Sequence, residues 1–148
     1  MKTHVRPRFA RFAPLLALAL AAGCTDLGLD TGGEAVAGLS IQDGSSGGTL
    51  VTVSSSNSVS GGLSIARNQQ RPLVILLRDA NGSVVTPGLG QSIRVTITNT
   101  QVASWQETGA GIGTLRGGTA TGQTSMRVDV IDSGTVEYTS PSIPIQVT

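Results

Sequence analysis

Short runs of alternating apolar and polar residues, separated by turns, fill most of this 148-residue chain. Ser92 to Thr98, Ser125 to Ile131 and Ile143 to Val147 each carry an apolar side chain at every second position. Successive side chains of a β-strand point to opposite faces, so each run can bury one face of a strand. No window after residue 24 repeats with the 3.6-residue period of a helix. The pattern predicts an all-β fold, a β-sandwich of about seven or eight short strands.

Three further stretches carry specific expectations. Thr49 to Ser54 alternates and is expected to form a hairpin with a strand at Gly62 to Arg67, through a turn at residues 56–58. Pro72 to Arg78 is apolar without alternation, which predicts a central strand covered on both faces. Gly109 to Gly118 is rich in glycine and lacks the Gly-Lys-Ser/Thr of a phosphate-binding loop, so we expect a flexible connection between strands.

The C-terminal strands complete the predicted core. Residues 132–134 (Asp-Ser-Gly) predict a turn into a strand with Val136 and Tyr138 facing inward. Pro141 and Pro144 lack an N–H, so the last strand is expected at a sheet edge or paired on one side only. The core residues expected from these phases include Leu73, Ile75, Leu77, Val95, Ile97, Val128 and Tyr138.

The first 24 residues are organised differently, with four cations, an apolar run from Phe12 to Ala22, and small residues before Cys24. The apolar run is shorter than the about 20 residues that a membrane-spanning helix needs. The arrangement resembles a bacterial lipoprotein signal. That resemblance implies cleavage between Gly23 and Cys24 and a lipid on the Cys24 thiol. Cys24 is the only cysteine of the chain, so it cannot form an internal disulfide.

The same resemblance bears on location. Thr25 follows the cysteine, and a residue other than aspartate there is compatible with forwarding to the outer membrane. We therefore expect a lipid-anchored protein of the cell envelope, in the outer membrane rather than the inner one. The signal departs from the lipoprotein pattern at Leu20, which stands four residues before Cys24 rather than three. The alternative is ordinary cleavage after residues 19–21, which would leave a secreted or periplasmic protein with a free thiol.

Three segments are expected from this organisation. They are a signal peptide at residues 1–23, a flexible tether at 24–48 and one sandwich domain at 49–148. Residues 25–48 mix glycine, serine and acidic residues with little apolar content, as a spacer would, although residues 39–41 could begin a strand. The remaining length matches a single β-sandwich of roughly 100 residues.

Charge and composition after the leader exclude some classes of function. Residues 25–148 contain six arginines, nine carboxylates and neither histidine nor lysine, a net charge of −3. Nucleic-acid binding is not expected, because such surfaces combine a basic stripe with stacking aromatics, and only Trp105 and Tyr138 are aromatic here. General acid–base catalysis near neutral pH also lacks a histidine or lysine. We therefore expect no enzyme activity, no catalytic residue and no cofactor.

Three segments resemble one family. Leu73 to Gly82 (LVILLRDANG) is similar to the second strand and Arg-Asp-Ala-x-Gly turn of bacterial immunoglobulin-like domains of group 2, found in adhesins and surface proteins. Asn99 to Ser104 (NTQVAS) resembles the family's Asn-Pro-x-Val-Ala segment, with Thr100 in place of proline, and Gly117 to Thr121 (GGTAT) resembles its Gly-Thr-Ala-Thr. The resemblance implies an immunoglobulin-like Greek-key sandwich used as a spacer or binding module. It implies no catalytic residue.

Two places invite a ligand. Residues 79–83 (Asp-Ala-Asn-Gly-Ser) offer closely spaced oxygens as a calcium loop would, but they contain one carboxylate and lack the later acidic ligand of an EF-hand. Asp129 and Asp132 could join them only through the fold. A plain turn without a metal is the preferred interpretation. Trp105, with Gln106 and Glu107 beside it, could stack on a ligand, whereas core packing with a locally bonded indole N–H is the simpler interpretation.

Two classes of function follow. The first is an envelope-anchored, non-catalytic module for spacing, adhesion or protein interaction, with a protein or glycan partner on the cell surface. The alternative is a lipoprotein that binds carbohydrate or a small ligand through the loops at one end of the sandwich, where immunoglobulin-like folds place binding residues. An exposed Trp105 beside a concave polar surface would favour the second class, and a buried one the first.

Overall fold

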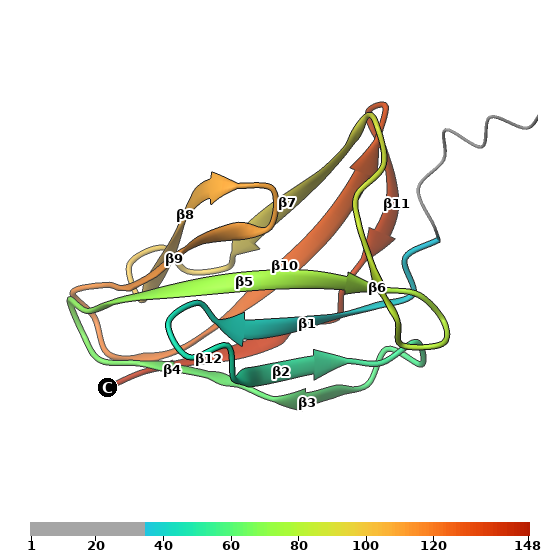
Figure 1. Cartoon of the computed structure of the whole chain (residues 1–148). Coiled ribbons are helices and arrows are strands. Elements are labelled where there is room, and N and C mark those ends of the chain that lie inside the picture. The colour runs from blue at the N-terminus through green and yellow to red at the C-terminus, as the bar shows by residue number, and fades with distance from the viewer. Residues whose placement is uncertain (1–34) are drawn as a thin grey trace, which may run out of the picture.

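The computed structural model describes residues 35–148, which fold into a β-sandwich and contain no helix (Figure 1). The predicted signal peptide, the Gly23–Cys24 cleavage site and the first part of the expected tether lie outside the described residues. The strands in the described part are β1 (Gly38–Asp43), β2 (Thr49–Val53), β3 (Val59–Gly61), β4 (Leu63–Ile65), β5 (Gln70–Arg78), β6 (Val84–Val85), β7 (Gln91–Ile97), β8 (Ala103–Gly109), β9 (Ile112–Gly117), β10 (Gly122–Asp132), β11 (Thr135–Thr139) and β12 (Ile143–Val147).

The strands form two sheets. The first has the order β3-β2-β1-β5-β9-β8, with β6 beside β5, and its pairs are antiparallel. In the second, β10 has β7 along one side, while β11 and β12 share the other, and β4 joins β12 in parallel. When β2, β3, β6 and β11 are set aside, each sheet keeps four strands. Strands β1-β5-β9-β8 of the first sheet face strands β4-β12-β10-β7 of the second, which is the arrangement of an immunoglobulin-like sandwich. The predicted all-β, immunoglobulin-like Greek-key fold is confirmed.

The strand count exceeds the prediction for local reasons. The hairpin partner of β2 is the short strand β3, reached through the expected turn, where Asn57 has a φ of 60°. The next strand, β4, crosses to the second sheet instead of completing the hairpin. Strand β9 lies in the stretch expected to be a connection, and β11 and β12, predicted as separate strands, pair with different parts of β10.

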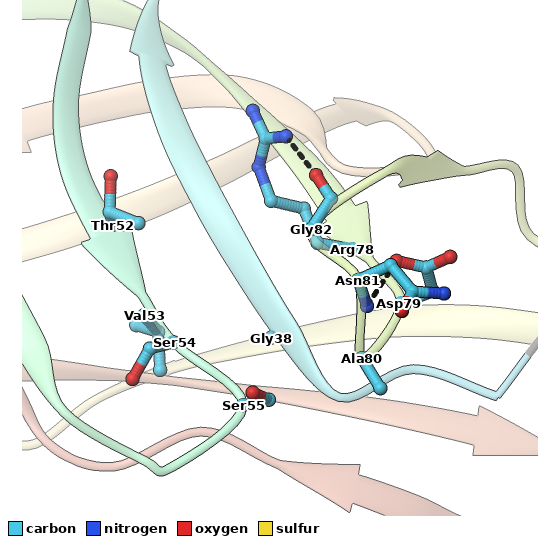
Figure 2. Close-up of a pocket in the computed structure, with 10 residues that line it drawn as sticks. All are labelled: Gly38, Thr52, Val53, Ser54, Ser55, Arg78, Asp79, Ala80, Asn81 and Gly82. Atoms are coloured by element: carbon cyan, nitrogen blue, oxygen red, sulfur yellow. Dashed lines mark hydrogen bonds between the residues drawn. The ribbon is translucent and has the colours of Figure 1, made fainter.

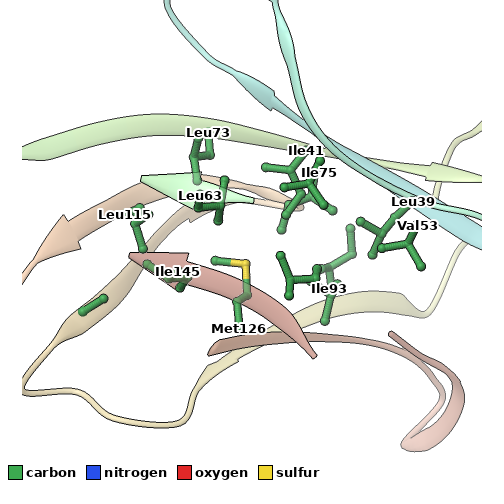
Figure 3. Close-up of a cluster of buried hydrophobic side chains, with 14 of the residues drawn as sticks. Leu39, Ile41, Val53, Leu63, Leu73, Ile75, Ile93, Leu115, Met126 and Ile145 are labelled. Carbon is green, nitrogen blue, oxygen red and sulfur yellow. The ribbon is translucent and has the colours of Figure 1, made fainter. Parts of the chain in front are cut away.

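The core fills the space between the sheets (Figure 3). Leu73, Ile75 and Leu77 of β5 and Val128 of β10 are buried as predicted, and so is Tyr138. Val95 and Ile97 are only partly buried, because their strand β7 is the edge of its sheet. The fully buried side chains also include Leu39, Ile41, Leu115, Met126, Ile143 and Ile145.

Strand β1 lies within the segment that composition assigned to the tether. It pairs with β2 through Leu39↔Val53 and with β5 through Ile41↔Ile75, and both of its apolar side chains are 0% exposed. The expected domain boundary at residue 49 is therefore wrong, and the folded part already includes residue 38. Glycine and serine in the β1–β2 turn lowered the apolar content of the window and hid a strand that needs only two buried positions.

An ion pair links the β1–β2 turn to strand β5. The Asp43 carboxylate accepts a hydrogen bond from Arg71 Nε at 2.8 Å and others from the backbone N–H groups of Ser45 and Ser46. The Arg71 hydrogen bond, followed by those from the Ser46 and Ser45 N–H groups, lowers the pKa of Asp43 to about 2. The β1–β2 connection is thus a closed polar turn.

Two other strand predictions are wrong. Strand β5 lies inside the first sheet, but only one of its faces is covered, because Val74 and Leu76 are half-buried on the outer face. The Gly109 to Gly118 stretch is not a flexible connection. It contains the turn at Gly111, with a φ of 69°, and the strand β9, in which Leu115 is fully buried. At several of these glycines, neighbouring backbone or side-chain atoms leave no room for a Cβ atom. Tight packing, rather than a need for flexibility, therefore explains the glycine content of this stretch.

The C-terminal strands differ from expectation in two details. Val136 is 46% exposed, because a register shift between Val130 and Ile131 places it opposite Ile131 instead of on the inner face. Strand β12 is not an edge strand, since it lies between β10 and β4. Its pairing with β4 begins at Ile145, one residue after Pro144, so the missing N–H of proline removes no bond from that ladder.

Candidate functional site

One side of the sandwich is open. Strand β7 pairs only with β10, and β8 pairs only with β9, among the strands of residues 35–148. Each therefore keeps one edge of unpaired backbone N–H and C=O groups, and the two strands contact each other where the chain crosses from one sheet to the other (Figure 1). Between them lies a groove of about 320 Å³, which we call the edge groove. It is lined by Arg94, Val95, Thr96, Ile97, Thr100, Ser104 and Trp105.

Trp105 closes one wall of the edge groove. It stands opposite the buried Leu115 in the β8–β9 ladder, so its ring faces inward, where it packs half-buried against the core. Gly113 makes room for the ring, because a Cβ there would lie 2.7 Å from Trp105 Cε2. The indole Nε1 is buried and has no hydrogen-bond partner in the described part of the chain. Core packing is thus observed, but the expected local bond to the indole N–H is not.

The other two predicted ligand residues lie apart from the groove. Gln106 and Glu107 are exposed on β8, and neither belongs to the lining of the edge groove. Arg94 and Thr96 do belong to it, although no sequence pattern singled them out as ligand residues. The alternation of residues 92–98 marked a strand, but which strand ends a sheet depends on the pairing of the whole chain.

Beside the edge groove, Arg94 forms an ion pair on the outer face of the second sheet. Its Nη2 and Nε donate to Asp129 Oδ2 at 2.7 and 3.1 Å, and Thr139 Oγ1 donates to the other carboxylate oxygen at 2.9 Å. Burial alone would raise the pKa of Asp129. The hydrogen bonds from Arg94 and Thr139 and the positive charges of Arg94 and Arg127 outweigh burial and lower the pKa of that carboxyl.

A second hollow lies at one end of the sandwich, among the loops. It has a volume of about 280 Å³ and is lined by the end of β2 and by the turn after β5 (Figure 2). Arg78 Nη1 donates to Gly82 O at 2.6 Å, and its Nε donates to Ser40 Oγ at 3.1 Å. Asp79 Oδ1 accepts from the N–H groups of Asn81 and Ser83, both at 2.8 Å. The predicted turn at residues 79–83 is confirmed, and its carboxylate stabilises the turn itself.

Chemical groups for a metal or for catalysis are sparse in the described part. No group of three or more His, Cys, Asp or Glu side chains comes together within residues 35–148. Asp129, which could have been a further ligand in a calcium site, forms an ion pair with Arg94 instead. The same residues contain no helix long and apolar enough to cross a membrane. Cys24, the predicted lipidation site, lies outside the described residues.

No protein-family model matches the chain, and no curated protein matches it. Solved structures with some similarity include domains 4 and 5 of the S-layer protein SbsC, with 22% identity and a TM-score of 0.46 over 60% of this chain and 48% of that one. The Yersinia pseudotuberculosis adhesin InvE has 26% identity and a TM-score of 0.37 over 57% of this chain. The Lin-41 filamin domain has 16% identity and a TM-score of 0.34, over 57% of this chain and 82% of that one.

The chain spans about half the length of the S-layer structure and 24% of the adhesin. All three TM-scores are below 0.5. The immunoglobulin-like assignment therefore rests on the strand order of this chain, and these likenesses add nothing to the question of function.

Proposed function

We propose that this chain is a non-catalytic immunoglobulin-like interaction module, similar to the group 2 domains of bacterial surface proteins. We propose further that a lipid on Cys24 holds it on the cell envelope, in the outer membrane rather than the inner one. The observation that carries the interaction role is the open side of the sandwich, where two free strand edges flank the edge groove.

The chemistry of that side suits an extended polypeptide. Unpaired backbone groups along a strand edge can form main-chain hydrogen bonds with an added strand, and pockets beside the edge receive alternate side chains. The half-buried Val95, Ile97 and Trp105 provide an apolar floor for such side chains. Adhesion to a surface protein would use the same contacts.

The ionisable groups support a binding role rather than a catalytic one. Residues 25–148 contain no histidine or lysine, so a general acid or base near neutral pH would have to be a carboxyl group of raised pKa. The two carboxyl groups with the closest partners, those of Asp43 and Asp129, have lowered pKa values instead. The net charge of −3 over residues 25–148 likewise argues against nucleic acid as a partner.

A carbohydrate- or small-ligand-binding role through the end loops receives less support. The hollow at that end has no aromatic side chain in its lining, and Arg78 and Asp79 within it are occupied by bonds to neighbouring chain segments. Trp105 is half-buried, and its predicted polar partners do not line its groove.

The anchoring part is tested by fractionating cells that express the full chain and its Cys24→Ser variant. Each acyl CH₂ contributes about 0.8 kcal/mol to membrane partition, so the chain bearing several acyl groups should stay with the membrane, and the variant should become soluble. Mass spectrometry of the wild type should find a lipid on an N-terminal Cys24. An unmodified N-terminus at Ala22 would refute the lipoprotein hypothesis.

The interaction part is tested in intact cells with a photo-crosslinking amino acid. It is placed at Thr96 on β7 or, as a control, at Ser60 on β3, which is an exposed position at the opposite edge. We expect a discrete protein adduct from position 96 only, and Ile97→Glu should abolish it by charging the groove floor. Equal adducts from both positions, or persistence of the adduct in the Ile97→Glu variant, would refute the edge groove as the binding surface.

A further inference from the structure

The outer face of the second sheet carries a polar hollow that the proposed function does not use. It has a volume of about 290 Å³ and lies over β7, β10 and the segment between β11 and β12. We call it the Arg127 hollow. It is lined by Thr96, Thr98, Ser125, Arg127, Asp129 and Ser142, which contribute four hydroxyl groups, one guanidinium and one carboxylate.

The strand order creates this hollow. Alternation along β10 places Ser125, Arg127 and Asp129 on its outer face, and Thr96 of β7 stands directly opposite Arg127. On the other side of β10 the chain changes from β11 to β12. There the buried Ser140 exchanges hydrogen bonds with the backbone of Val128, with Val128 N donating to Ser140 Oγ at 2.9 Å and Ser140 N donating to Val128 O at 2.8 Å. This holds the crossing segment inward and leaves the space beside Arg127 uncovered.

The lining of the hollow carries one positive and one negative charge, but Arg94 beside the hollow pairs with the negative one. Asp129 accepts from Arg94 on one oxygen and from Thr139 on the other, so its strong bonds are committed away from Arg127. Within residues 35–148 the exposed Arg127 forms no ion pair and no side-chain hydrogen bond. Two arginines thus surround one carboxylate, and the remaining positive charge faces the hollow in a chain whose residues 25–148 are negative overall.

We propose that the Arg127 hollow binds a carboxylated sugar, such as the uronic acid unit of an acidic polysaccharide. The guanidinium of Arg127 can hold a carboxylate with two parallel N–H···O bonds. The hydroxyl groups of Thr96 and Ser142 can both donate to and accept from sugar hydroxyls, and the bonded pair of Ser125 and Thr98 hydroxyls, 2.9 Å apart, keeps one free O–H and free acceptor positions. The volume is close to the lower end of about 300 Å³ for small-molecule sites, which exceeds the need of a single inorganic anion.

The strength of the interaction follows from the same features. No aromatic ring lines the hollow, so stacking does not add to the polar contacts. One sugar unit is therefore held weakly, and a polymer with repeated carboxylates gains when several of its units bind several copies of the chain. This inference does not rest on the proposed function: Thr96 lines both surfaces, but Arg127 lines only the hollow and Ile97 lines only the edge groove.

The test measures binding to the full chain, purified in mild detergent, by titration calorimetry at low ionic strength. The probe is trigalacturonate, and its matched control is the same trisaccharide with the carboxylates masked as methyl esters. Arg127→Gln removes the guanidinium, and Arg116→Gln is the control variant, because it makes the same charge change at an exposed position on the other sheet. Inorganic sulfate and triglutamate serve as competing anions.

We expect trigalacturonate to bind and its methyl ester to bind at least about tenfold more weakly, which corresponds to about 1.4 kcal/mol. Arg127→Gln should weaken binding by a similar factor, Arg116→Gln should leave it unchanged, and salt should weaken it. The inference is overturned if the free acid does not bind, or if the ester binds as well as the acid. It is also overturned if sulfate or triglutamate matches the sugar, which would mean a plain anion site or a peptide site.

Discussion

Replacing Ile41 by alanine tests whether β1 belongs to the folded core. Ile41 is 0% exposed and lies between β2 and β5, so its side chain is surrounded on the inner face of the first sheet. Ile41→Ala removes three carbons, a transfer loss of about 2.4 kcal/mol at 0.8 kcal/mol per buried CH₂. The cavity left behind adds to this, and buried Ile→Ala changes cost about 2–5 kcal/mol in total. We expect the free energy of unfolding to fall by about 3 kcal/mol.

The assay is urea unfolding of protein beginning at residue 25, followed through the fluorescence of Trp105. This is the only tryptophan of the chain, and it is packed against the core. The matched control is Gln42→Ala, one residue away on the outer face, which should change the free energy of unfolding by less than about 0.5 kcal/mol. If Ile41→Ala has an effect as small as that of the control, β1 is a tether segment, and the assignment of the first sheet is wrong.

Two further predictions concern pH and a buried hydroxyl. The pKa of Asp43 is about 2 in the folded state, against 3.8 for an ordinary aspartate, and that of Asp129 is also lowered. The contribution of Asp43 to stability is therefore complete above about pH 4 and is lost as the pH falls toward 2, so Asp43→Asn should flatten acid unfolding curves in that window. Tyr138 Oη is buried without a partner in the described chain, so Tyr138→Phe should leave stability unchanged or raise it by up to about 1 kcal/mol in urea unfolding at pH 7. Burial raises the pKa of Tyr138, so the wild type, but not the Tyr138→Phe variant, should lose stability from this group above about pH 10. If Tyr138→Phe lowered the free energy of unfolding at pH 7, the hydroxyl would have to be hydrogen-bonded.

The period of the sequence predicted most of the strands because burial of one face is a local property. Residues 125–131 and 143–147 could be assigned from alternation alone, and both are buried in the expected phase. Val136 could not, since its exposure follows from a register shift between β10 and β11. The position of β12 between two strands depends on β4, which lies about 80 residues earlier in the chain and pairs in parallel.

The site was less accessible to sequence reasoning than the fold. Trp105 was selected because a lone tryptophan is conspicuous, and it does line a groove. Arg127 has no distinguishing neighbours in the sequence. Its role in the polar hollow comes from Thr96 and Ser142, which reach it from different strands, and from the pairing of Asp129 with Arg94. Residues that become important by pairing of distant strands leave no local pattern.

Strand β7 lies at the junction of the two surfaces, and this makes them separable. Thr96 lines both the edge groove and the Arg127 hollow. Ile97 faces inward, opposite Met126, and Arg127 faces outward, opposite Thr96, because successive residues of a strand point to opposite faces. Ile97→Glu should therefore weaken polypeptide binding at the edge without affecting the acidic sugar, and Arg127→Gln should do the reverse. If either variant abolished both interactions, one continuous surface would have to serve a single ligand.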